Sequence, residues 1–435
     1  MARRTLAIAF LFTLVASVAF GQVYSTKKEI AVFRLGYYSW RIPQSALSAI
    51  DSQIQNVFVN LGRFTVIGYA QSIEAQDVSQ FIDTLRRYKE KSAGLPEQVQ
   101  LGRVAFTRAD LDHLTGSFVV VVPAVSYFNM DRADDGDFIA AIDTSFAFVN
   151  VQDLTTMAQF TVSTSGRGTD RQDAIRAATD GIPLQLSYEI RKIPAFQIKT
   201  GIIDFSGGDV VMEFGRNMGV KAGDEYSVVT PKIFAGHQVD ESSGVLIVKE
   251  VHAEYSIAHV LYADRRLYVG DQLVEIPRIG LEASFYSDLI AGQSSYGSSS
   301  ALSAFPLLGV RFTLTRGTYR VRPTVEIEVP LRQAMYGGFP TNLFLGIEMF
   351  NIYAGRVQLA PTALFGGGGY YFDNNFYLTH AGGKAQLDVS LLLNKDMKLS
   401  FEGGYTVMLG LLNDPYFWAA SYWGPFGGIG ITAKF

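Results

Sequence analysis

The 435-residue chain contains no cysteine, only 5 histidines and only 3 tryptophans. The absence of cysteine excludes disulfides, thiolate metal ligands, cysteine nucleophiles and membrane attachment through a lipidated N-terminal cysteine. Neither sign of charge dominates. The chain has 37 Lys and Arg and 41 Asp and Glu, which gives a net charge of only −4. This balance argues against a basic nucleic-acid-binding protein and against an acidic disordered chain.

Beyond the N-terminus, the sequence has no long apolar run. At the N-terminus, Arg3 and Arg4 precede an apolar stretch at residues 6–18, and the small residues of 19–21 follow it. This pattern predicts a signal peptide over 1–21, cleaved before Gln22; the alternative, an uncleaved membrane helix, is disfavoured because the stretch is shorter than a bilayer crossing needs. The exported chain is then free in the periplasm, secreted, or inserted in a membrane as a β-barrel.

The composition changes near residue 278. Residues 279–435 hold 22 of the 42 glycines and 26 of the 56 aromatic residues but only 20 of the 78 charged ones. Polar and apolar residues alternate through 318–331, a run longer than the five or six residues of an average soluble strand. Such a run fits a tilted strand of a membrane barrel.

Eight strands are expected in this segment, and their connections alternate between long and short. The expected long loops include 290–305 and 366–379, the second of which contains the glycines at 366–369. Outer-membrane barrels have this alternation, with short periplasmic turns and long extracellular loops. The last strand places Ile429, Ile431, Ala433 and Phe435 on one face. It resembles the C-terminal strand that the barrel assembly machinery recognises, and the segment resembles eight-stranded outer-membrane barrels of the OmpA and OmpX type. The expected strands are 281–289, 306–315, 318–331, 342–352, 354–365, 380–393, 397–409 and 426–435.

Charged residues of these strands fall on the face opposite the continuous apolar set. A soluble eight-stranded barrel of the lipocalin kind would have its apolar face inside, so the reversed polarity favours a membrane barrel. Seven basic and seven acidic side chains would then pair in a narrow lumen and close it, although a narrow ion path is an alternative. The expected lumen residues are Glu282, Asp288, Arg311, Arg320, Arg322, Glu326, Glu328, Glu348, Arg356, Lys384, Asp388, Lys398, Glu402 and Lys434.

Strand and helix patterns alternate through residues 22–195, and this alternation predicts an α/β sandwich. Three segments carry a resemblance to known domains: 60–67 (NLGRFTVI) after a helix, the strand 116–121 (GSFVVV), and 149–153 (VNVQD) before an Ala-rich helix. They resemble the periplasmic α/β domain shared by the curli-secretion (CsgG) family and the N-terminal domain of the TolB family. The resemblance implies a periplasmic domain, which the C-terminal barrel would anchor in place of the curli family's lipid.

The sequence pattern of residues 196–278 predicts a small β module. Its segments 219–229 (GVKAGDEYSVV) and 268–274 (YVGDQLV) each place Gly-Asp before a strand, because Gly permits the turn and Asp bonds back to the backbone. They are similar to the C-terminal β domain of flagellar assembly protein T, which implies a cell-envelope interaction module.

No histidine spacing suits a metal and no serine nucleophile motif is present, so we expect no enzyme and no catalytic, cofactor or metal site. The expected fold class is α+β multidomain: an α/β sandwich (22–195), a small β module (196–278) and an eight-stranded antiparallel transmembrane barrel (279–435). The expected function is to anchor periplasmic interaction domains for envelope or appendage assembly. Outer-membrane lipid, the barrel assembly machinery and periplasmic envelope proteins are the expected partners, and nucleic acid is not. The alternatives are a small channel or secretion pore, and an adhesin acting through long extracellular loops.

Overall fold

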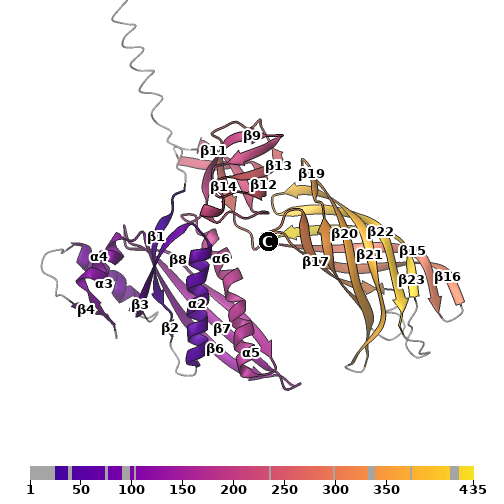
Figure 1. Cartoon of the computed structure of the whole chain (residues 1–435), viewed down its shortest axis with the longest axis horizontal. Coiled ribbons are helices and arrows are strands. Elements are labelled where there is room, and N and C mark those ends of the chain that lie inside the picture. The colour runs from indigo at the N-terminus through magenta and orange to yellow at the C-terminus, as the bar shows by residue number, and fades with distance from the viewer. Residues whose placement is uncertain are drawn as a thin grey trace, which may run out of the picture.

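The computed structural model describes residues 25–37, 42–73, 77–90, 98–101, 104–234, 237–296, 299–331, 339–372, 375–411 and 421–435. The predicted signal peptide lies outside these residues. The described chain is mostly strand, with few helices, and forms an open sheet with helices, a small closed barrel and a large closed barrel (Figure 1). None of the described helices has the length and apolarity needed to cross a membrane.

The N-terminal unit, called the α/β unit below, is a mixed sheet covered on both faces by helices. Strand β1 runs parallel to its neighbours β3 and β6, and β6, β7 and β8 form an antiparallel meander. Alternate β1 residues enter two separate cores: Ile30 and Val32 pack under helices α2, α5 and α6, and Ala31 and Phe33 pack under α3 and α4. The elements are β1 Lys28–Arg34, β2 Gly36–Tyr37, α2 Gln44–Asn60, β3 Phe64–Ser72, α3 Val78–Glu90, β4 Gln98–Leu101, β5 Val104–Thr107, α4 Arg108–Gly116, β6 Val119–Arg132, β7 Phe138–Asn150, β8 Thr155–Gly168, α5 Arg171–Asp180 and α6 Ile182–Lys192.

The second unit, called the β module below, is a small closed barrel in the order β10-β13-β12-β11-β14-β9. Both predicted Gly-Asp turns are present. Asp224 accepts a hydrogen bond from the backbone N–H of Lys221, and Asp271 accepts one from the backbone N–H of Tyr268, both at 2.8 Å. The strands are β9 Lys199–Ser206, β10 Asp209–Met212, β11 Glu225–Phe234, β12 His237–Val251, β13 Ser256–Ala263 and β14 Gln272–Ile276, with a 3-10 turn at Arg216–Met218.

The C-terminal unit confirms the predicted eight-stranded antiparallel barrel. Successive strands pair in chain order, β18 pairs with β20, and the ring closes where the first strand, β15, pairs with the last, β23. The short strand β19 pairs with β20 beside β18. The strands are β15 Leu281–Tyr296, β16 Ser299–Leu314, β17 Val321–Pro330, β18 Phe339–Met349, β19 Ile352–Ala354, β20 Val357–Phe372, β21 Asn375–Asn394, β22 Met397–Gly410 and β23 Ser421–Lys434.

Two predicted long loops are mostly strand. The expected loop 290–305 is largely the paired ends of β15 and β16, and the expected loop 366–379 is largely the paired ends of β20 and β21. The glycines at 366–369 read as loop residues in the sequence, but each pairs with a residue of β18 and of β21. Gly368 also leaves space for two inward side chains, since a Cβ there would collide with Asn342 and His380.

Candidate functional site: the barrel lumen and the barrel mouth

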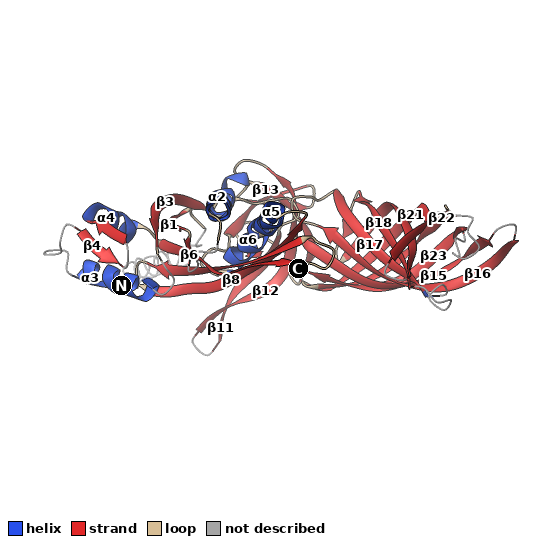
Figure 2. Ribbon diagram, turned by 90° about the horizontal axis from the view of Figure 1, so that it is seen from below, coloured by secondary structure: helices blue, strands red, loops and turns tan. Residues whose placement is uncertain are grey.

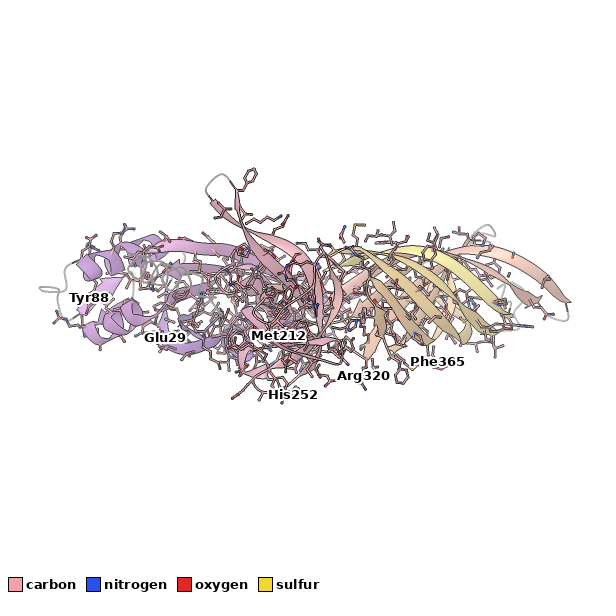
Figure 3. The ribbon with its side chains drawn as sticks, turned by 90° about the horizontal axis from the view of Figure 1, so that it is seen from above. Glu29, Tyr88, Met212, His252, Arg320 and Phe365 are labelled. Atoms are coloured by element: carbon pink, nitrogen blue, oxygen red, sulfur yellow. The ribbon has the colours of Figure 1, made fainter. Side chains whose placement is uncertain are left out.

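The outer surface of the large barrel is apolar. On β18, Leu343 and Leu345 are 49% and 59% exposed, while Phe344 between them is fully buried in the lumen. The same alternation runs around the ring, and Figure 3 shows Phe365 on the outside. Other exposed apolar side chains of these strands include Phe285, Leu289, Leu308, Phe312, Ile327, Leu387, Phe401, Leu409, Ile429 and Ile431.

The lumen holds most of the charged side chains expected there. These side chains occupy buried, inward positions of the strands although they are ionisable, so the polarity of this barrel is the reverse of that of a soluble one. The buried charged residues of the lumen are Glu282, Asp288, Arg311, Arg322, Glu326, Glu328, Glu348, Lys384, Asp388, Lys398, Glu402 and Lys434.

Arg311 on β16 lies at the centre of this network. Its guanidinium pairs with Glu326, with Asp388 at 2.7 Å and with Glu402, so one side chain connects four strands. Lys384 pairs with Glu328 and, at 3.2 Å, with Glu326. These bonds cross the lumen, and the strands therefore cannot move apart without exposing buried charges.

Arg320 and Arg356 do not face the lumen, contrary to the sequence prediction. Both are exposed, and Figure 3 shows Arg320 on the outside of the barrel. The alternation that predicted them continues into turns: β17 begins only at Val321, and Arg356 lies in the turn between β19 and β20. Among the described residues, the lumen therefore contains seven acidic and five basic side chains rather than seven of each.

Apolar and aromatic side chains fill the remainder of the lumen. The sequence interpretation considered only the charged inward positions and missed these residues, although they continue the same alternation. His380 contributes a buried polar link there, because it contacts Asn342 at 3.0 Å and Asn342 donates to the Tyr422 hydroxyl at 2.9 Å. The apolar cluster consists of Tyr286, Ile290, Phe305, Leu307, Phe344, Leu364, Met408, Tyr422 and Phe426.

The end of the barrel formed by the turns at 315–318, 355–356 and 395–396 and by Phe435 is called the mouth. The β module is seated on it: Arg316 of the first turn donates to Asp224 at 2.7 Å, and the Gly317 N–H donates to the Ala222 carbonyl at 2.7 Å. A small cavity of about 10 Å³ lies between the module and the mouth, which is room for about one water molecule.

Buried ion pairs connect the α/β unit to the same module. Glu275 accepts hydrogen bonds from Arg63 at 2.6 Å and Arg191 at 2.5 Å, and Arg191 also pairs with Asp224 at 3.1 Å. Burial alone would raise the pKa of the Glu275 carboxyl, but the two guanidinium charges outweigh burial and hold that pKa well below its usual value. The three units are therefore linked through one continuous set of charges.

Glycines at this joint allow two turns to touch. Gly62 and Gly219 both have positive φ, 70° and 78°, and a Cβ on Gly62 would lie 2.7 Å from the Gly219 nitrogen. The segment 60–67 thus contributes both a close backbone contact and the buried Arg63. In the sequence, Gly62 before Arg63 is only a partial signal of this joint, because the burial of the arginine depends on the β module.

The predicted assembly signal lies on the outer face of β23. Ile429, Ile431 and Phe435 are each about half exposed, Ala433 is partly buried, and β23 pairs with β15 along this stretch. Among the described residues, no group of three or more His, Asp or Glu side chains is arranged to hold a metal ion.

No protein-family model matches the chain, and no curated protein matches its sequence. Among solved structures, neisserial surface protein A (NspA) is 11% identical and covers 36% of this chain and 97% of its own, with a TM-score of 0.26. The Ail attachment invasion locus protein of Yersinia pestis is 8% identical and covers 36% and 99%, with a TM-score of 0.21. The PelC dodecamer of Paraburkholderia phytofirmans is 14% identical and covers 38% and 89%, with a TM-score of 0.22. These similarities carry no inference about function, which rests on the geometry of the chain.

Proposed function

We propose that this chain is an outer-membrane protein of a Gram-negative-type bacterium, whose barrel anchors the α/β unit and the β module in the periplasm. The reversed polarity of the barrel carries the proposal. Exposed Leu343 and Leu345 would face water in a soluble protein, whereas in a bilayer they face lipid. A closed ring leaves no strand edge in the hydrocarbon, which is the condition for crossing it with strands.

The filled lumen supports an anchor rather than a channel. Arg311 and its three carboxylate partners obstruct one part of the lumen, the apolar cluster around Phe344 and Leu364 fills another, and the β module covers the mouth. An eight-stranded barrel is just wide enough for its own side chains. A channel or secretion pore would require several of these groups to move together.

The anchored region would act by binding other envelope proteins during envelope or appendage assembly, without catalysis. The resemblances of residues 60–67 and 219–229 to periplasmic modules support this role. A further support is the ribbon formed by β11 and β12, which projects from the β module away from the barrel (Figure 2). Near its tip Ile233 and Phe234 are 80% and 77% exposed, and exposed apolar side chains of this size favour a protein partner.

The membrane assignment is tested on washed outer membranes by electrophoresis in detergent with and without boiling. A folded membrane barrel should migrate at two positions, one for the unboiled and one for the boiled chain. A single position together with release of the protein by an alkaline wash would contradict the proposal.

The binding role is tested separately by cross-linking in cells. The double variant Ile233→Ser, Phe234→Ser should lose a cross-linked envelope partner, and Val59→Ser, a control at another exposed apolar residue, should keep it. Equal cross-linking in both variants would contradict a role for the ribbon.

A further inference from the structure

The barrel has one seam, where its first strand β15 meets its last strand β23. Apart from the short strand β19, which lies between β18 and β20 in the chain, all other neighbouring strands of the ring follow one another in the chain, so the seam is where the ring must close. Arg278 lies just before β15 and reaches across this seam. Its guanidinium donates to the Lys434 carbonyl of β23 at 3.0 Å and to the Lys395 carbonyl at 2.5 Å, and it pairs with Asp396 at 2.8 Å.

Glu225 of the β module holds both sides of the seam. One carboxylate oxygen accepts from Arg278 at 3.3 Å, and the other pairs with the Lys434 ammonium. Glu225 and Lys434 are both buried. A buried carboxylate between two cations is stable only while both cations stay in place, so these contacts require β15 and β23 to be side by side.

The module contacts the rest of the mouth as well. Asp224 binds Arg316 in the turn between β16 and β17, and the Arg356 guanidinium, in the turn before β20, lies 3.9 Å from the centre of the Tyr262 ring. Arg278 binds Lys395 and Asp396 in the turn between β21 and β22, so the contacts reach all three turns of the mouth. Only the closed ring brings these turns and Lys434 together.

We propose that the β module is a clasp for the barrel seam: it docks only on the closed ring and prevents the ring from opening between β15 and β23. Through Asp224 and Arg191 the docked module also fixes the α/β unit, so closure of the barrel and positioning of that unit are one event. This inference goes beyond anchoring, and it does not depend on which partner the anchored region binds.

The test compares two glutamates of the same module. Glu225→Gln removes the charge at the seam, and Glu241→Gln removes the charge of an exposed ion pair with Lys232. The readout is the rate at which the folded electrophoretic form becomes the unfolded form at one temperature below boiling. We expect Glu225→Gln to convert at least about tenfold faster than Glu241→Gln, because only the first change removes the carboxylate partner of a buried cation, Lys434. Equal rates would overturn the clasp.

Engineered disulfides locate the effect, since the chain has no cysteine of its own. Ile429 faces Ser287 across the seam and Phe401 on its other side, and such opposed positions are close to disulfide distance. In the Glu225→Gln background, Ser287→Cys with Ile429→Cys should restore the slow conversion, and Phe401→Cys with Ile429→Cys should not. If Glu225→Gln yields no folded barrel, the seam disulfide should restore folding and the other should not. Equal rescue by both disulfides would overturn the proposal.

Discussion

Glu275 is the residue on which the joint between the α/β unit and the β module most depends. Its buried carboxylate accepts hydrogen bonds from Arg63 at 2.6 and 3.2 Å, from Arg191 at 2.5 Å and from the Ile198 N–H at 3.0 Å. The substitution Glu275→Gln keeps the shape of the side chain and removes the charge. Arg191 then still pairs with Asp224, whereas Arg63 loses its carboxylate partner and keeps its hydrogen bond to the Phe196 carbonyl.

Removing one member of a buried ion pair costs about 3–5 kcal/mol. The glutamine oxygen still accepts hydrogen bonds, so we expect the lower end of that range, about 3 kcal/mol, which is roughly a hundredfold in the population of the separated state. The assay is hydrogen exchange at the Ile198 amide in the full-length protein in detergent. Glu189→Gln, which breaks an exposed pair with Lys192, is the control and should change exchange little. Equal exchange in the two variants would refute the reasoning.

Three further predictions follow from the same contacts. Because the arginine charges hold the Glu275 pKa below its usual value, its stabilisation should be complete above about pH 4.3, where the unfolded carboxyl titrates, and should decline progressively as the pH falls below that value. Loss of Ile198 protection at higher pH would contradict this. Leu345→Arg, on the outer surface of the barrel, should destabilise it by about 2–4 kcal/mol in denaturant titrations of vesicle-inserted protein, and Leu345→Met should not. Equal midpoints would contradict a lipid contact. Arg311→Met should lower the temperature at which the folded electrophoretic form is lost, because it leaves three buried carboxylates without their shared cation. The exposed control Arg320→Met should leave that temperature unchanged. Equal temperatures for the two variants would contradict the central role of Arg311.

The barrel could be predicted from the sequence because each strand separates two different environments. Alternation through 318–331 and at the C-terminus reflects an exposed apolar face on one side of each strand and a packed lumen on the other. The same alternation extends past the ends of strands, and for this reason it placed Arg320 and Arg356 in the lumen wrongly. Where β17 begins depends on the turn that docks against Asp224, and local sequence does not contain that information.

The joint and the seam could not be predicted, because their partners are distant in the chain. Arg63 and Glu275 are 212 residues apart, and Glu225 and Lys434 are 209 apart. Each of these ion pairs joins residues of two different folded units, so no local sequence pattern specifies it. The sequence did contain partial signals, namely Gly62 before Arg63 and Gly223 before Asp224, but a glycine turn beside a charge also occurs at surfaces.

The claim that the barrel crosses a membrane is tested most directly by nitroxide labels on single cysteines along β18. Labels at 343, 345 and 347 should collide readily with dissolved oxygen, which concentrates in the lipid, and labels at 342 and 344 should be shielded from it. The signal should therefore alternate with a period of two in phase with the exposed leucines. Ready collision of the outward labels with a water-soluble paramagnetic reagent instead of oxygen would contradict the membrane barrel.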